Sequence, residues 1–296
     1  GCTTQLGGYV FLSQGIWRFV RHYDKVFDFA LVHEDHGTDS PYSIVSHDDQ
    51  AFFYGQDGFQ AIGGGGQRQI GDHWVNDWFL DNCNQDRLNV ICAALDPLVG
   101  RIFWLFPTPG NDTTTLDHII CHDMHNEEKP WTHAAVSAEY IFPGATPGAT
   151  LADLTTLYST LDAVPYPLGS RIWLGGNPGL AAFDSAHKLA FFSGSNLTAT
   201  VQTGLFQPVP GQRFYVNGFR GGGDTSSASG RVSSVERPQD TQAWQASATV
   251  TAQGLIPQRA SGKYMRAEMT IPAGTTWDHA AGIDFQDDDL VPDGQR

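Results

Sequence analysis

The sequence predicts an all-β fold: propeller-like repeats of antiparallel strands, followed by a C-terminal β element, with few short helices. Short apolar runs alternate with turns, and 33 glycines and 16 prolines are spread among them. Residues 9–19 and 50–62 look alike, each with an apolar run, a polar turn containing Gly and an aromatic-bearing strand. Their offset of about 42 residues is typical of four-stranded propeller blades. Because one blade cannot bury its aromatic face alone, we expect neighbouring blades to stack.

Residues 9–62 are therefore expected to be strands joined by tight turns, ending in a flexible linker at the four glycines 63–66. A phosphate-binding loop would need spaced glycines directly before a helix, together with a Lys, and this run has neither. One short helix is predicted within 71–80, with Asp72 as its N-cap. Its tryptophans, Trp74 and Trp78, are interpreted as core residues that share a face with Val75.

Two further hairpins are predicted in the middle of the chain. Strands at 88–95 and 101–106 flank a turn with Pro at its second position and Gly at its end. Strands at 116–123 and 131–136 form the second hairpin. After a Pro/Gly turn region at 143–150, the sequence predicts one short helix within 150–161. Strands resume at 171–176 and 179–192.

The composition changes after residue 197 to Thr, Ser, Gln and Gly with alternating Val, Phe and Tyr. We therefore assign residues 1–196 to the propeller blades and 197–286 to a closing blade or β-sandwich. Residues 287–296 are predicted to be a disordered tail. A mobile loop is expected at 221–230.

Charge and cysteine content exclude several classes of protein. The net charge is −15, and no basic run exists, which argues against ordinary nucleic-acid binding. Charged residues make up only 17%, a low value that suggests burial in an assembly. No apolar run reaches 18 residues, so no membrane span is expected. Cys2, Cys83, Cys92 and Cys121 show no pairing pattern and are expected to be reduced, mostly buried thiols.

The densest group of candidate metal ligands lies in residues 117–125, Asp-His-Ile-Ile-Cys-His-Asp-Met-His. On a helix, His118 and His122 would share one face and could bind zinc. On the predicted strand they would lie about 13 Å apart, too far for one ion. His122 with His125 across the turn, joined by His133 from the partner strand, remains an open alternative. No metal site is assigned.

Hydrolytic chemistry receives little support from the sequence. A glycosidase needs carboxylates that converge from separate blades. The available aspartates lie beside turn-forming residues, where such side chains ordinarily bond their own backbone; they are Asp28, Asp57, Asp96, Asp153 and Asp184. No G-x-S-x-G motif is present. We assign no catalytic residue and no cofactor-binding residue, and we expect neither an enzyme nor a bound cofactor.

A series of short motifs runs through most of the chain in a particular order. They are Val10-Phe-Leu12, Gly15-Ile-Trp-Arg18, Thr38-Asp-Ser-Pro-Tyr-Ser43, Phe53-Tyr-Gly-Gln-Asp-Gly-Phe59, Ile62-Gly63, Trp78-Phe-Leu-Asp81, Ala93-Ala-Leu-Asp-Pro97, Ile102-Phe-Trp-Leu-Phe-Pro107, Leu161-Asp-Ala-Val-Pro-Tyr-Pro-Leu168, Ser170-Arg-Ile-Trp173, Leu180-Ala-Ala-Phe-Asp184, Leu189-Ala-Phe-Phe192, Arg259-Ala-Ser-Gly-Lys-Tyr264 and Ile271-Pro-Ala-Gly274. In this order they resemble the packaged-DNA stabilisation proteins of short-tailed bacteriophages, which are tail hub or nozzle proteins. The chain departs from that pattern at Cys121-His-Asp-Met-His125, where similar proteins tend to have an aromatic-rich hairpin.

The resemblance implies a structural virion protein of the phage tail that is assembled in the bacterial host cytoplasm. It implies a homo-oligomeric ring of six copies below the portal and adaptor proteins, which continues the DNA channel and retains the packaged genome. It further implies a platform for tail fibre or tailspike proteins and non-specific contact with genome DNA. An acidic channel wall would leave that DNA mobile, since repulsion prevents sticking.

A second hypothesis from another class is a carbohydrate-binding or glycoside-hydrolase β-propeller. Exposed Trp and Tyr beside carboxylates in a cleft would favour it, because sugars stack on aromatic faces. A large interface between subunits would favour the ring. A secreted scaffold propeller is disfavoured by the unpaired cysteines.

Overall fold

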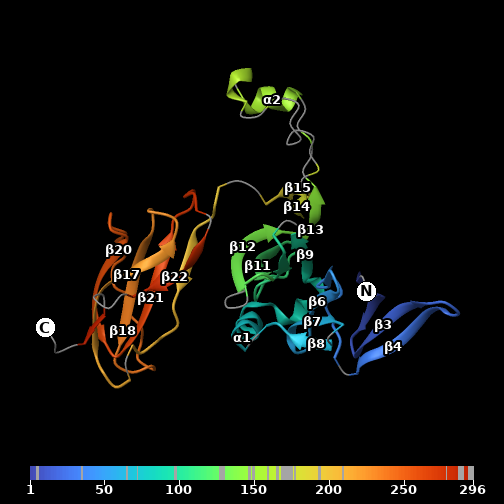
Figure 1. The fold of residues 1–296 in the computed structure, drawn as a ribbon, viewed down its shortest axis with the longest axis horizontal. Helices are drawn as coiled ribbons and strands as arrows, with labels where there is room; N and C mark the ends of the chain where they lie inside the picture. The colour runs from blue at the N-terminus through green and yellow to red at the C-terminus, as the bar shows by residue number, and fades with distance from the viewer. Residues whose placement is uncertain are drawn as a thin grey trace. The chain divides into compact units, whose positions relative to one another are not determined.

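The computed structural model describes residues 1–296 apart from 5–6, 35, 65, 72, 97–98, 127–130, 146–147, 149–150, 159, 165–166, 168–175, 177, 193–194, 209, 278, 286–289 and 293–296. Strands dominate and helices are few and short, which confirms the predicted all-β class (Figure 1). The chain forms two compact units, Gly1–Phe192 and Ser193–Arg296.

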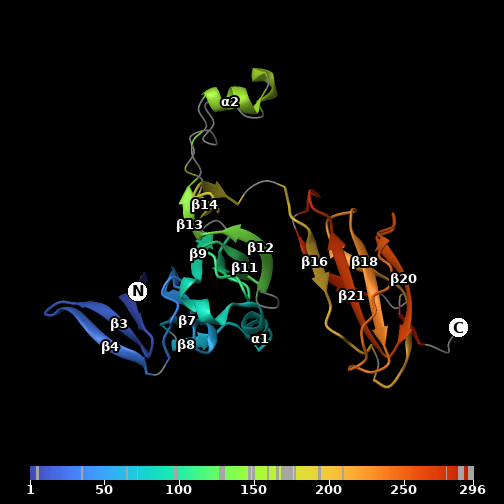
Figure 2. The same cartoon turned by 180° about the vertical axis from the view of Figure 1, so that it is seen from behind.

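The first unit is a series of antiparallel sheets in which each strand pairs with the next one along the chain (Figures 1 and 2). Three sheets have four strands and the last has three; we call these sheets blades 1 to 4. Blade 1 comprises β1 Cys2–Thr4, β2 Gly7–Leu12, β3 Gly15–His22 and β4 Val26–Glu34; blade 2 comprises β5 Val45–His47, β6 Gln50–Gly55, β7 Gly58–Gly63 and β8 Gly66–Gln69. Blade 3 comprises β9 Cys92–Asp96, β10 Arg101–Phe106, β11 Leu116–Asp123 and β12 Trp131–Ala138; blade 4 comprises β13 Tyr140–Ala145, β14 Pro178–Phe183 and β15 Leu189–Phe191.

The blades are joined through their first strands. β1 contacts β5, β5 contacts β9, and β9 contacts β13. Each of these strands is an edge of its own sheet, with the later strands further out. This is how blades of a propeller meet at their inner strands. The described residues form an open series of such blades rather than a closed barrel.

The two look-alike segments occupy equivalent places in blades 1 and 2. Residues 9–19 cover most of β2, a two-residue turn and most of β3, with Leu12 opposite Gly15. Residues 50–62 cover β6, the same kind of turn and β7, with Gly55 opposite Gly58. The repeat in the sequence is therefore the central hairpin of a blade.

The central strands of the inner blades are buried on both faces, and this builds the core. Along β6, Ala51 and Phe53 pack with Tyr9 and Ile16 of blade 1. The alternate residues Phe52 and Tyr54 pack on the other side, against Ile102, Trp104 and Phe106 of blade 3. Side chains of a strand point alternately to its two faces, so one apolar run serves two interfaces.

Blade 3 repeats this arrangement toward blade 4. Cys92, Leu105 and Ile119 lie on the face opposite Trp104 and pack with Ile141 and Leu180 of blade 4. Three apolar layers thus join four blades. Each fully buried large apolar side chain contributes about 1.5–3 kcal/mol to folding, so these layers dominate the stability of the unit.

One helix covers part of the layer between blades 2 and 3. α1, His73–Asn82, places Phe79 in the core beside Tyr54 and Phe106, at ring-centroid distances of 4.8 and 4.7 Å. Val75 and Trp78 pack on the same layer, as predicted, although Phe79 is the deeper residue. The predicted cap Asp72 and the side chain of Trp74 lie outside the described residues.

Other local predictions need correction. The glycines 63–66 are not a linker: Gly63 pairs with Gly66 in the β7–β8 hairpin, because a tight turn needs the positive φ of Gly66, +100°. Residues 85–90 form a 3₁₀ helix, η1 Gln85–Val90, where a strand was predicted from residue 88. Asn84 caps it by accepting a hydrogen bond from the Asp86 N–H, which favours the helical turn.

The remaining helices lie between β13 and β14. The helix predicted within 150–161 is α2, Leu151–Leu157, and η2, Leu161–Ala163, follows it. The strand predicted at 171–176 falls outside the described residues except for Gly176, as does the Ser170–Trp173 motif.

The second unit, Ser193–Arg296, is a β-sandwich. One sheet has the order β16-β21-β18-β19, and the other has β20-β17-β22 with β23 also paired to β17. Their inner faces form one core that includes Val216, Phe219, Val232 and Met265. The strands are β16 Ala199–Gln202, β17 Phe214–Gly223, β18 Ser229–Val235, β19 Ala248–Thr249, β20 Leu255–Gly262, β21 Tyr264–Ile271, β22 Ala280–Asp284 and β23 Leu290–Pro292.

Two predictions in this unit are wrong in part. The mobile loop expected at 221–230 begins too early, because Gly221–Gly223 belong to β17 and pair with β22. The tail expected to be disordered at 287–296 contains β23, whose Leu290 and Val291 pair with Val216 and Tyr215. Its apolar residues add to the edge of a sheet, which offsets the entropy lost on ordering. Residues 286–289 and 293–296 lie outside the described residues.

Gly58 and Gly66 are a matched pair for testing the blade 2 turns. Both have a positive φ, but a Cβ at Gly58 would overlap the carboxamide of Asn76, whereas a Cβ at Gly66 would have no atom within 4 Å. The Asn76 side chain is fixed by hydrogen bonds to the Phe59 N–H and the Gly71 carbonyl. We expect Gly58→Ala to lower the free energy of unfolding by about 1–3 kcal/mol more than Gly66→Ala. Urea unfolding measures both, and equal losses would contradict the expectation.

Candidate functional site

The histidine cluster of the sequence divides into two places on blade 3. His118 on β11 and His133 on β12 come together, with 3.2 Å between His118 Nε2 and His133 Nδ1. Trp78 of α1 packs on His133 at a ring-centroid distance of 4.4 Å. Burial lowers the pKa of both histidines, and His118 further lowers that of His133. This pair is therefore neutral and stacked within an aromatic cluster.

His122 lies four residues after His118 on β11, opposite Trp131 and away from the His118–His133 pair. Because it occupies a strand, His122 does not share a metal-binding site with His118. Within the described ranges, no three His, Cys, Asp or Glu side chains come close enough to bind one metal ion. His125 extends beyond the strand, and 75% of its side chain is exposed.

His122 itself is buried in an unusual way. Only 8% of the residue is exposed, and its Nδ1 atom has no hydrogen-bond partner. The rings of Phe52 and Trp131 pack around it. Burial, and secondarily the charge of Arg68, lowers the pKa of His122 to about 4. The residue is thus a neutral imidazole at neutral pH, with one unsatisfied nitrogen.

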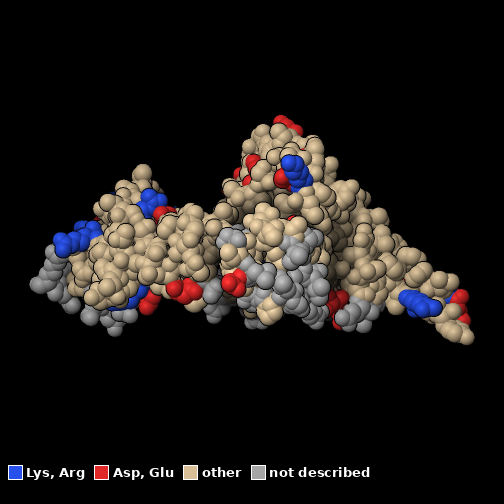
Figure 3. Space-filling model, turned by 90° about the horizontal axis from the view of Figure 1, so that it is seen from above, with Lys and Arg blue, Asp and Glu red and all other residues tan. Residues whose placement is uncertain are grey.

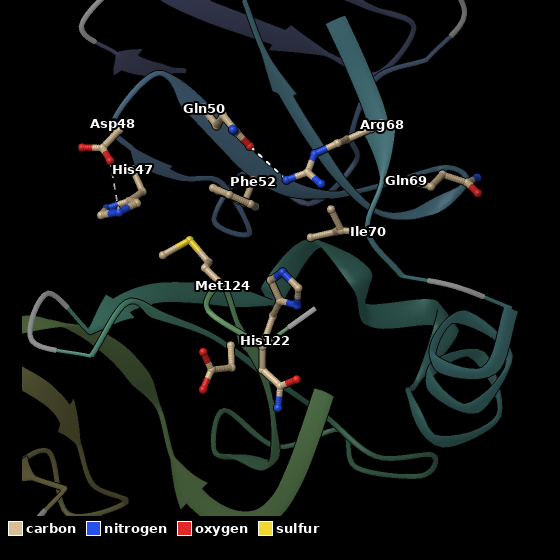
Figure 4. A pocket seen from close by; sticks show the side chains of 11 residues that line it. His47, Asp48, Gln50, Phe52, Arg68, Gln69, Ile70, His122 and Met124 are labelled. Carbon is tan, nitrogen blue, oxygen red and sulfur yellow. Dashed lines mark hydrogen bonds and ion pairs between the residues drawn. The ribbon is translucent and has the colours of Figure 1, made fainter. Parts of the chain in front are cut away.

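A pocket of about 560 Å³ lies next to this imidazole (Figure 4). Blade 2 contributes His47, Gln50 and Arg68, and Phe52 and Ile70 add apolar surface, while His122 and Met124 come from the end of blade 3. Arg68 donates a hydrogen bond to Gln50 Oε1 at 3.2 Å. The pocket is therefore polar at its rim and suited to hydrogen bonding with a small polar molecule.

The two carboxylates of the pocket are already engaged. Asp123 Oδ2 accepts a hydrogen bond from Arg101 Nε at 2.9 Å, and its Oδ1 accepts one from the His125 N–H at 3.0 Å. Burial alone would raise the pKa of Asp123, but these bonds outweigh it and hold the pKa below its usual value. Asp48 lies 3.5 Å from His47 Nε2. Asp123 therefore lacks the raised pKa expected of a general acid.

The other candidate aspartates are distributed over separate elements. Asp28 is on β4, Asp57 in the β6–β7 turn, Asp96 at the end of β9, Asp153 in α2, and Asp184 directly after β14. Asp184 accepts hydrogen bonds from the Ala186 and Lys188 N–H groups, as the turn chemistry predicts. Asp57 instead pairs with His36 Nδ1 at 2.9 Å.

The cysteines are free thiols and three of them are buried, as expected; Cys2 is half-buried. Burial raises the pKa of Cys83 and Cys121 to about 12 and that of Cys92 to about 11. Thiolate chemistry is therefore suppressed at these positions.

The outer face of blade 1 is an uncovered apolar surface. Cross-strand pairing puts Phe19 opposite Phe29 and Trp17 opposite Leu31. Because side chains alternate, Leu12 and Phe27 also point to this face. We call Leu12, Trp17, Phe27, Phe29 and Leu31 the first end face; each is between 37% and 57% exposed.

The outer face of blade 4 is uncovered in the same way. Tyr140, Phe183 and Leu189 form one row across its three strands. Phe142 and Phe191 point to the same side in the next row, and Phe142 contacts Phe183 at a centroid distance of 5.3 Å. We call these five residues the second end face. Tyr140, Phe183 and Leu189 are between 40% and 54% exposed.

Charged side chains are sparse on the visible surface (Figure 3), where uncharged residues cover most of the area. This matches the low charged content of the chain. None of the helices that the structure describes has the length and apolarity needed to cross a membrane.

Comparison with known proteins identifies no relative: no family model and no curated protein matches the chain.

The sequence pattern indicated His122 as a candidate metal ligand, but it predicted neither the pocket beside this residue nor its unpaired nitrogen. The pocket depends on where the ends of blades 2 and 3 meet, and no local pattern encodes that. The end faces had a signal in the sequence, the apolar run Val26-Phe-Asp-Phe-Ala-Leu-Val32, which was not used.

Replacing His122 by Phe tests the cost of its unpaired nitrogen. We expect His122→Phe to raise the free energy of unfolding at pH 7 by about 1 kcal/mol, because an unsatisfied buried polar atom is removed.

The same variant also tests a pH dependence. Between pH 6.5 and 4 the unfolded wild-type chain takes up a proton at His122 that the folded chain does not. Lowering the pH through this range therefore lowers wild-type stability by up to about 1.4 kcal/mol per pH unit from this residue, and the variant loses that slope. Urea unfolding across this range, with the exposed His125→Phe as control, measures the difference; an unchanged slope would contradict the assignment.

Proposed function

We propose that this protein is a structural component of a bacteriophage tail, a hub or nozzle subunit that assembles with copies of itself into a ring. The ring continues the DNA channel below the portal and adaptor proteins, retains the packaged DNA and anchors tail fibres or tailspikes. The order of short motifs supports the family, and the uncovered apolar surfaces support assembly. The protein acts without catalysis.

The observation that carries the proposal is the exposure of β4. This nine-residue strand is the outer edge of blade 1, and eight of its residues are exposed. Its sequence is apolar along the face of Phe27, Phe29 and Leu31, and mostly apolar on the other face apart from Asp28. A long, apolar edge strand is an aggregation hazard unless something covers it.

The outer strands of the inner blades show the contrast. β8, Gly66-Gln-Arg-Gln69, is polar, and β12 is rich in small and polar residues. These strands are suited to contact with water, whereas β4 is not. The difference supports an assembly in which blade 1 is covered by another chain.

The acidic charge of the chain fits a channel that DNA passes through. A net charge of −15 repels phosphate and so disfavours adhesion. Retention would then depend on the physical closure of the channel.

The pocket favours a second candidate, a carbohydrate-binding propeller. It offers Arg68, Gln50 and Gln69 for hydrogen bonding to a polar ligand. Among its described lining residues, Phe52 supplies the phenyl ring, but it is buried at 3% exposure and gives a sugar little surface to stack on. The ring is therefore the first candidate.

The oligomeric state of the purified protein tests the proposal. We expect native mass spectrometry and negative-stain imaging to find a closed ring with a central hole, since both end faces need cover. Binding or hydrolysis of glycans is measured on the same preparation. A monomer at every concentration, or a monomer that cleaves glycans, would overturn the proposal.

A further inference from the structure

We infer that the subunit contact is head-to-tail: the first end face of one copy packs against the second end face of the next copy. This inference rests on the proposed function and identifies the surfaces that close the ring. The occupant of each end face is therefore a second copy of this chain.

The stack inside the first unit supplies the pattern for this contact. Successive blades meet through aromatic and aliphatic side chains, as where Phe11 of blade 1 contacts Phe53 of blade 2 at a centroid distance of 4.8 Å. The end faces have the same composition. If blade 4 of one copy packs against blade 1 of the next, the two end faces form an apolar layer like those between successive blades within one chain.

The size of the end faces fits a stable contact. Large apolar and aromatic side chains bury about 150–250 Å² each when fully covered, and those of the first end face are about half exposed. Covering them removes on the order of 400 Å² of apolar surface from water on that subunit. A standard interface buries about 800 Å² per partner, so the apolar side chains of the first end face supply about half of that area.

Head-to-tail pairing also covers both end faces with one kind of contact. Two copies joined through their first end faces would leave both second end faces in water. A heterologous contact uses one patch of each kind per subunit, and it closes into a ring when the rotation between copies permits. The two faces belong to different blades, so each can be altered separately.

Two single substitutions in the full-length chain test the pairing. Phe29→Glu alters the first end face and Phe183→Glu the second, and both residues are exposed in the subunit. Leu80→Glu, on α1 and 49% exposed, is the matched control.

We expect each end-face variant to require an at least thirtyfold higher concentration for assembly than the wild type, which is about the effect of removing an interface hot spot. The control variant should assemble like the wild type. Near-ultraviolet circular dichroism confirms that all three variants fold.

The decisive measurement is an equimolar mixture of the two end-face variants. The intact second end face of Phe29→Glu can pair with the intact first end face of Phe183→Glu, so native mass spectrometry should find a heterodimer and no ring. A homodimer of either variant would indicate like-with-like pairing and overturn the inference. A mixture that stays monomeric would overturn it as well.

The outcomes separate this inference from the proposed function. Rings that form from both variants as readily as from the wild type would refute the end-face contact and leave the ring proposal standing. A wild type that is monomeric throughout refutes both. In the double variant Phe29→Cys/Phe183→Cys, a short bismaleimide should produce a ladder of covalent multimers. Neither single-cysteine variant should give this ladder. The same treatment of the wild type measures any cross-linking through Cys2.

Discussion

The structure of the first unit depends on one requirement: an inner blade must remove both of its faces from water. A lone sheet has one core face and one wet face, but here β6 and β10 send alternate side chains into different layers. Each layer is shared, so a blade is stable only with neighbours on both sides. The requirement explains why apolar runs such as Ala-Phe-Phe-Tyr lack polar alternation. At the two ends of the series, the residues that the structure describes place no further sheet on the outer face.

Several features of the fold could be predicted because local patterns encode them. The repeated hairpin at 9–19 and 50–62 was found from its apolar runs and turn, and β10 and β11 begin and end where the sequence predicted. The predicted elements were wrong where one local sequence pattern is compatible with two structures. The four glycines 63–66 suit either a linker or a hairpin turn, and only pairing with β8 decides for the turn. The sequence predicts a loop at the glycines 221–223, because a lone glycine run carries no sign of its partner strand β22.

The candidate site was less predictable than the fold. Strand geometry correctly separated His118 from His122, since four residues along a strand span too great a distance for one ion. The partnership of His118 with His133 was missed, because it depends on the register of β11 with β12. The pocket beside His122 is formed by residues from two blades, and its shape follows from tertiary packing alone. The exposure of a strand also cannot be read from its apolar residues. β4 and β6 both have the sequence of a core strand, but β6 lies in the interior and β4 at the surface.

The burial of the thiols has a consequence for their reactivity. With pKa values of about 11 to 12, Cys83, Cys92 and Cys121 contain almost no thiolate at neutral pH, and thiolate is the species that oxidants and disulfides attack. These three thiols are therefore poor targets for oxidants as long as the fold is intact. The cysteines are free, so the covalent chain adds no cross-link to the fold, and packing alone protects the thiols.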